Sequence, residues 1–224
     1  MEAIVVLLAI LPFLLVGLGA LVGWRMEKQR HQALMSLGPQ LGLTFAREEK
    51  LGNPLPEPAA SFPLFQTGHG RRSRNHGYKT LADGAQVHTF DYQYTSGSGK
   101  SRTTYRMTIF AVIQADLHLP CFRLHPEIPI LHDIAKFFGM QDINFTSYPQ
   151  FSRSYLLRGE PEAQIRQMFE RGLLSFFERH PGWCLEAQGP AVILWRHNQR
   201  VPPHELRSFL SFGEEFYQRL LACA

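Results

Sequence analysis

Cysteine is scarce in this sequence, which has three among 224 residues. Cys121, Cys184 and Cys223 share no repeated spacing, and an odd number without CxxC pairs excludes a disulfide framework and paired zinc knuckles. A reducing compartment is the easier fit. Repeats at a fixed period and a low-complexity tail are also lacking, which excludes solenoid and array architectures.

Charge is almost absent from the first 24 residues, where Glu2 is the only acid and no Lys or Arg occurs. The uncharged run from Ala3 to Trp24 is long enough, as a helix, to cross a hydrocarbon core of about 30 Å. A cleaved signal peptide is the alternative, but it would have a basic N-terminal region and a shorter apolar run. We therefore predict that residues 1–24 form a transmembrane anchor.

The residues that follow this run set its predicted orientation. Trp24 has the position of an interfacial aromatic side chain, and Arg25, Lys28 and Arg30 flank the membrane on the C-terminal side. The positive-inside rule then predicts a single-pass protein of the cell membrane, with its C-terminal domain in the cytoplasm.

Signatures of catalysis are lacking as well, since the chain has neither an HExxH nor a GxSxG motif. The stretch YTSGSGKSRTTYRMTIF contains Gly99-Lys100-Ser101, which resembles the end of a phosphate-binding loop, but Tyr94 stands where the first glycine of that loop belongs. The residues after the triplet alternate as a strand, whereas such a loop must open a helix. We interpret the stretch as the tip of a β-hairpin, and we predict no catalytic residue and no cofactor.

Metal-ligand spacing is missing too. His118, Cys121, His125, His132 and Asp133 lie close together in the sequence, but none of them follows a spacing typical of zinc. Strand alternation also puts His118 on the face opposite to Cys121 and His125. We therefore predict scattered surface histidines and no metal site.

One basic segment, HGRRSRNHG, is a candidate binding site. Arg71, Arg72 and Arg74 lie between glycines, so the segment is predicted as a solvated loop. The alternative is an anion clamp for a phosphate, a lipid headgroup or RNA, since a guanidinium group can donate two parallel hydrogen bonds to one oxyanion. Nucleic acid is disfavoured because no aromatic side chains that stack on bases are interleaved with these arginines.

The remainder of the chain, residues 43–224, is predicted as one cytoplasmic α+β domain of antiparallel strands and interspersed helices. Residues 25–42 form a juxtamembrane helix that ends or kinks at Gly38-Pro39, and an irregular, proline-rich loop covers Gly52–Phe65. Strands are expected at 42–47, 85–94, 103–114, 120–127, 152–159, 183–189 and 191–196, and helices at 128–138, 162–179 and 202–224.

The helix predicted at 162–179 has an apolar stripe of Phe169, Leu173 and Phe176. We expect this stripe to pack against the hairpin that carries Trp183 and Ile193. The opposite face holds side chains that suit water, namely Gln164, Gln167, Arg171 and Glu178. In the last helix, we expect the core side to comprise Leu206, Phe209, Leu210, Phe216, Leu220 and Leu221.

Several phrases occur in a familiar order: FDYQYTSGSGKSRTTYRMTIFAV, LPCFRLHPE, QDINFTSYPQFSRSYLLRGEPE and GWCLEAQGPAVILWR. Together they resemble an uncharacterised bacterial family of single-pass membrane-anchored proteins with a domain of unknown function. The resemblance covers roughly Leu43 to Arg200. It implies an anchor followed by one α+β domain, and it transfers no functional residues because the family has no assigned activity.

These observations favour a non-enzymatic, membrane-tethered cytoplasmic domain that acts as a protein-interaction module. Its expected partners are the lipid bilayer, through the N-terminal helix, and an unidentified protein. One alternative is a binder of anionic lipid or nucleic acid through the basic segments, with steep salt dependence. The other is a hydrolase with an unrecognised site in a concave pocket.

Overall fold

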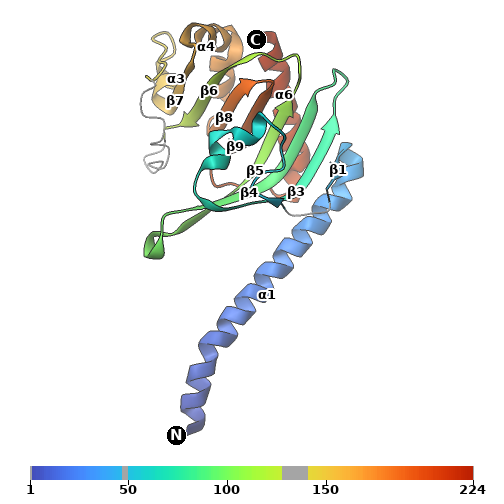
Figure 1. Cartoon of the computed structure of the whole chain (residues 1–224), viewed down its shortest axis with the longest axis vertical. Helices are drawn as coiled ribbons and strands as arrows, with labels where there is room; N and C mark the ends of the chain where they lie inside the picture. Colours follow the sequence, from blue (N-terminus) through green and yellow to red (C-terminus); the bar gives the residue numbers. More distant parts are fainter. Residues whose placement is uncertain (1, 47–49, 128–140, 224) are drawn as a thin grey trace.

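The computed structural model describes residues 2–46, 50–127 and 141–223, with side chains from residue 15 onward apart from that of Lys50. A single helix, α1 (Glu2–Leu41), runs through the predicted boundary between anchor and juxtamembrane segment. It extends away from an α+β domain toward the N-terminus (Figure 1). Helix α1 continues through Gly38-Pro39 and ends at Leu41, less than one turn beyond the predicted end. The helix predicted at 128–138 lies outside the described residues.

The predicted membrane span is not confirmed. Among the residues that the structure describes, no helix combines the length and the apolar character that crossing a membrane requires. The first part of the uncharged run from Ala3 to Trp24 lies outside the residues whose side chains are described.

Within the described residues, nine strands form one antiparallel sheet. Eight of them follow the order β1-β3-β4-β5-β9-β8-β6-β7, and β2 also pairs with β3. Their bounds are β1 (Thr44–Phe45), β2 (Lys50–Leu51), β3 (His69–Thr80), β4 (Gln86–Ser96), β5 (Thr103–Ile113), β6 (Leu119–Pro126), β7 (Tyr155–Glu160), β8 (Trp183–Gly189) and β9 (Ala191–Arg196).

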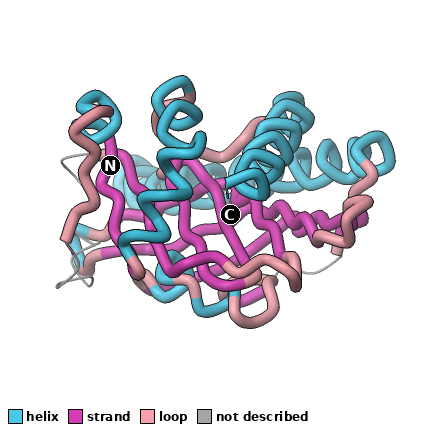
Figure 2. Tube along the Cα trace, turned by 90° about the horizontal axis from the view of Figure 1, so that it is seen from above, coloured by secondary structure: helices cyan, strands magenta, loops and turns pink. Residues whose placement is uncertain are grey.

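Helices cover both faces of this sheet, most of them on one side (Figure 2). The last turns of α1 lie on what we name the helical face, together with α4, α5 and α6. The opposite surface, named the loop face, packs against the segment that carries η1 and α2. The bounds are η1 (Ala59–Ser61), α2 (Pro63–Gln66), η2 (Gly99–Ser101), α3 (Pro149–Ser154), α4 (Glu162–Met168), η4 (Phe169–Leu173), α5 (Leu174–Arg179), η5 (Pro203–Glu205) and α6 (Leu206–Cys223).

The hairpin predicted at Gly99-Lys100-Ser101 is confirmed. Strands β4 and β5 pair in an unbroken antiparallel register that ends at Ser96 and Thr103, and the triplet itself is the short turn η2. Gly97 has a φ of 77°, and a Cβ there would lie 2.4 Å from the carbonyl oxygen of Ser101. This turn therefore requires glycine for its own geometry, without any phosphate.

The helix predicted at 162–179 is present but interrupted. It consists of α4, the π-turn η4 and α5, because Gly172 leaves the helical conformation inside η4. Phe169, Leu173 and Phe176 are fully buried on the helical face, as predicted. They share one core cluster with the β8–β9 hairpin, as predicted, through side chains such as Trp183, while strand alternation turns Ile193 of that hairpin to the loop face.

One of two further predictions about helix surfaces needs correction. Glu178 is exposed, but its carboxylate accepts a hydrogen bond of 3.1 Å from the backbone N–H of Phe151 near the start of α3. Leu221, expected in the core, is 38% exposed on α6. The other apolar side chains predicted for the core side of α6 are buried.

Candidate functional site

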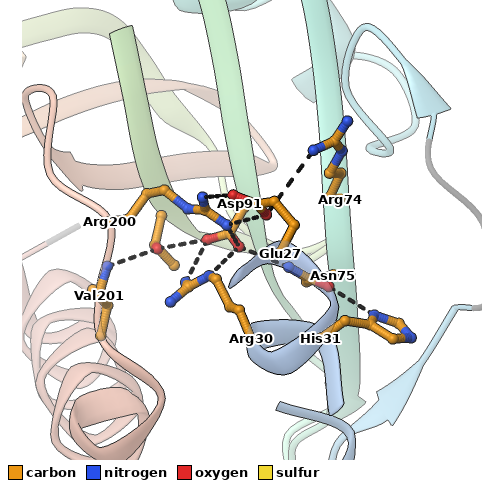
Figure 3. Close-up of polar contacts among 9 residues, drawn as sticks. Glu27, Arg30, His31, Arg74, Asn75, Asp91, Arg200 and Val201 are labelled. Carbon is orange, nitrogen blue, oxygen red and sulfur yellow. Dashed lines mark hydrogen bonds and ion pairs between the residues drawn. The ribbon is translucent and has the colours of Figure 1, made fainter. Parts of the chain in front are cut away.

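A buried carboxylate, Asp91 on β4, lies where α1 meets the helical face of the sheet. Its side chain is only 7% exposed. Arg30 on α1 donates to both of its oxygens at 2.7 Å, from Nε to Oδ2 and from Nη2 to Oδ1 (Figure 3). This bidentate, charge-assisted pair ties the helix to the sheet.

Three more groups donate to the same carboxylate. Asn75 on β3 reaches Oδ2 at 2.8 Å, Thr108 on β5 reaches Oδ1 at 2.9 Å, and Arg200, after β9, reaches Oδ2 at 2.9 Å. Burial alone would raise the pKa of Asp91, but the guanidinium groups of Arg30 and Arg200 outweigh it and hold the pKa below its ordinary value. Asp91 is therefore a fully bonded anion, unsuited to act as a base.

Glu27, one turn before Arg30 on α1, completes this cluster, which we name the Asp91 network. It accepts from both terminal nitrogens of Arg200, one of them at 2.9 Å, and lies 3.9 Å from Arg74 (Figure 3). The hydrogen bonds with Arg200 hold the pKa of Glu27 below its ordinary value. Arg200 thus bridges two acids, one on the helix and one on the sheet, and fixes the direction in which α1 leaves the domain.

The four residues predicted to flank a membrane take different positions. Arg30 lies inside the Asp91 network with a side chain only 13% exposed. Trp24, Arg25 and Lys28 are exposed on α1, and the Lys28 ammonium group lies 5.2 Å from the centre of the Trp24 ring. Flanking a membrane remains a prediction for these residues.

The basic segment is a strand rather than the predicted loop. Arg71, Arg72 and Arg74 belong to β3, which pairs with β4 across two irregularities of register. Arg71 donates to the carbonyl oxygen of Phe65 at 2.9 Å, a residue of the loop-face cluster, whereas Arg74 approaches Glu27 on the helical face. Arg72 and Arg74 line one pocket, but Arg71 lies on the other face, so a clamp made of all three is not formed and anion binding by them stays a prediction.

A groove of about 770 Å³ opens beside the Asp91 network, between α1 and strands β3, β4 and β5. Its charged lining comprises Glu27, Lys28, Arg74, Arg106 and Arg200. Its apolar lining on the helix comprises Ala20, Gly23 and Trp24. The sequence pattern indicated Lys28 and Arg74 separately. It did not indicate Arg106 or Arg200, although alternation along β5 put Arg106 on the same face as Thr108.

A second buried acid, Glu186 on β8, lies on the loop face. Arg123 donates to its Oε1 from Nε at 2.9 Å, and the backbone N–H of Leu64 donates to Oε2 at 3.1 Å. Burial raises the pKa of Glu186 despite these partners. His125 Nε2 lies 3.9 Å from the same carboxylate. The predicted assignment of His125 to the surface is wrong, since it is only 8% exposed.

The structure brings no metal ligands together in the part of the chain that it describes, where no group of three His, Cys, Asp or Glu side chains is placed to share an ion. His118 instead faces the backbone oxygen of Asp116 at 2.8 Å, and Cys121 is exposed. His132 and Asp133 lie outside the described residues.

Acidification is expected to destabilise the domain through His125. Burial, and then the charge of Arg123, lower its pKa from 6.5 to about 3. Because the unfolded chain binds the proton more readily, this contribution to stability is complete above pH 6.5 and is lost as the pH falls toward 3. His125→Phe should therefore flatten the decline in unfolding free energy between pH 6.5 and 4, by up to roughly 1.4 kcal/mol per pH unit.

The measurement is denaturant unfolding of the full-length chain in detergent at several pH values. His204→Gln is the matched control, since the His204 side chain is 79% exposed. An unchanged slope for His125→Phe would show that His125 is not the titrating group.

Comparison with known proteins shows a similarity of fold and no similarity of sequence to a known family. Neither a scan against models of protein families nor a search of curated proteins finds a match. The structure is similar to the crystal structure of the mycobacterial trehalose monomycolate transport factor A, TtfA, with a TM-score of 0.58 over 86% of this chain and 94% of that one. The two sequences are 10% identical, so the likeness shows a shared α+β architecture.

Proposed function

We propose that this chain is a membrane-tethered accessory domain without catalytic activity, which acts through a partner protein. One observation carries the proposal: α1 projects from the domain (Figure 1), and large apolar side chains along it are exposed. These are Leu15, Val16, Leu18, Leu21, Val22, Trp24 and Met26, exposed by between 46% and 73%. Exposed apolar surface of this extent needs a cover of lipid or protein.

Lipid is the cover that the sequence favours. The exposed side chains continue the uncharged run that begins at Ala3, and cations follow it immediately. In this proposal the run spans the cell membrane once, and the positive-inside rule puts the α+β domain in the cytoplasm. The Asp91 network supports a tether that fixes the position of the domain relative to α1, because the network holds α1 on the sheet.

The accessory role rests on the fold neighbour and on the absence of catalytic chemistry among the described residues. The neighbour is named as a transport factor, which supports a transport-related role for the present fold. The two strongly buried acids, Asp91 and Glu186, are both bound by arginine. Function through a partner protein accounts for such a domain better than hydrolysis does.

Membrane extraction tests this proposal. The full-length chain should remain in the membrane fraction after alkaline carbonate and leave it in detergent. Leu18→Asp with Val22→Asp should release the chain, since Leu18 lies inside the run, where a charge costs up to about 2.5–3.5 kcal/mol on insertion. Leu18→Ala with Val22→Ala is the matched control and should stay bound. Release of the parent chain by carbonate would overturn the tether.

A further inference from the structure

The groove between α1 and the sheet has an excess of positive charge. Four cations line it, whereas Glu27 is its one acid. Among the described residues, no carboxylate lies within ion-pair distance of Lys28 or Arg106, and both side chains are exposed. Lys28 instead contacts the ring of Trp24. Clustered cations of this kind, with Arg74 and Arg200 beside them, attract an anion with several acceptor oxygens.

The wall of the groove that α1 supplies is apolar. Ala20, Gly23 and Trp24 form it, and their spacing of three and four residues puts them on one face of the helix. A Cβ added at Gly23 would meet no atom within 4 Å, so the helix backbone is open to close approach there. An occupant that fits this groove therefore has an anionic group beside an apolar chain.

We propose that the groove binds a bilayer lipid through its anionic phosphate headgroup. This inference rests on the proposed membrane tether, which brings the groove to the level of the headgroups. The phosphate lies against Lys28 and Arg106, and the start of an acyl chain runs along Gly23 and Trp24. A volume of about 770 Å³ suits a headgroup with the first part of its chains.

The Asp91 network prepares this site before any lipid arrives. Arg200 binds Glu27 on α1 and Asp91 on the sheet, so the two walls of the groove are already in place before binding. The same network fixes the distance between the apolar wall on α1 and the cations on the sheet. Lipid binding would therefore orient the domain relative to the membrane surface without a change in fold.

Native mass spectrometry of the full-length chain in detergent tests the inference, with dioctanoyl phosphatidylglycerol and dioctanoyl phosphatidylcholine as probes. The parent should bind phosphatidylglycerol at least about tenfold more tightly than phosphatidylcholine, and rising salt should weaken the binding of phosphatidylglycerol. Lys28→Gln with Arg106→Gln should reduce the affinity for phosphatidylglycerol by roughly 10- to 30-fold, because each cation near a lipid headgroup contributes on the order of a factor of five.

The matched control is Arg153→Gln with Arg179→Gln, which removes the same charge from two exposed side chains on α3 and α5. It should bind like the parent. Equal retention of both lipids, or equal losses in the two double variants, would overturn the inference. So would displacement of phosphatidylglycerol by inorganic phosphate at a similar concentration, which would identify a site for free anions. Carbonate extraction of the same variants tests the membrane tether separately from the lipid site. Both double variants should stay in the membrane fraction even where lipid binding is lost.

Discussion

Replacing Asp91 with asparagine is expected to destabilise the folded chain by about 3–5 kcal/mol. Asparagine keeps the shape of the side chain but removes the charge that two guanidinium groups share. Arg30 and Arg200 would then remain largely buried, with an amide in place of the carboxylate between them. Arg200 would keep Glu27 as a counter-ion, but Arg30 would lose the carboxylate that it binds, and leaving a buried cation unpaired costs far more than losing an exposed pair.

Tryptophan fluorescence during denaturant unfolding of the full-length chain in detergent measures this effect, since Trp195 is buried in the sheet. Asp116→Asn makes the same chemical change at an exposed position and should alter stability by no more than about 0.5 kcal/mol. If Asp91→Asn unfolds like the parent, the Asp91 network does not hold α1 in place.

Strand and helix positions were predictable where the local pattern is strong. Alternation along β4 and β5 predicted both strands and the turn between them, because each places apolar side chains on one face at every second residue. Helix α6 was likewise predicted from its apolar stripe, although Leu221 at the edge of that stripe is exposed.

Strand β3 could not be predicted in the same way. Its polar, glycine-containing sequence has the composition of a loop, and β-branched residues are missing from all but its last position. Pairing with β4 imposes the strand, and two irregularities of register accommodate it. Such pairing is a tertiary effect, so the composition of the segment alone favours the wrong structure.

The Asp91 network lies beyond sequence reasoning for a related reason. Its members are far apart along the chain: Arg30 is 61 residues from Asp91, and Arg200 is 109 residues from it. The sequence pattern predicted Arg30 at the membrane surface, because cations after an apolar run usually lie there. Only the packing of α1 on the sheet shows that one of these cations is buried against an acid. Arg106 and Arg200 were not predicted as part of a site because they too lie far in the sequence from the other residues of the groove.

Aromatic packing around η4 and α5 leads to the second large effect. Phe169 is fully buried, and its ring lies 5.5 Å from that of Phe122 and 5.8 Å from that of Phe151. Phe176 is buried as well, with the rings of Phe212 and Phe216 at 5.2 and 5.9 Å. Each side chain therefore joins a helix to the helical face or to a neighbouring helix.

Phe169→Ala and Phe176→Ala are each expected to destabilise the chain by about 3–5 kcal/mol, because truncation removes a buried ring and leaves a cavity. For a domain of this size the melting temperature should fall by roughly 6–20 °C. Gly172 interrupts the helix between the two rings, so local helix propensity cannot compensate for the lost packing. Gln167→Ala, on the exposed side of α4, is the control and should melt like the parent. Thermal melting of the full-length chain in detergent distinguishes the cases: if both alanine variants melt like the parent, the buried rings contribute little and this face does not hold the domain together.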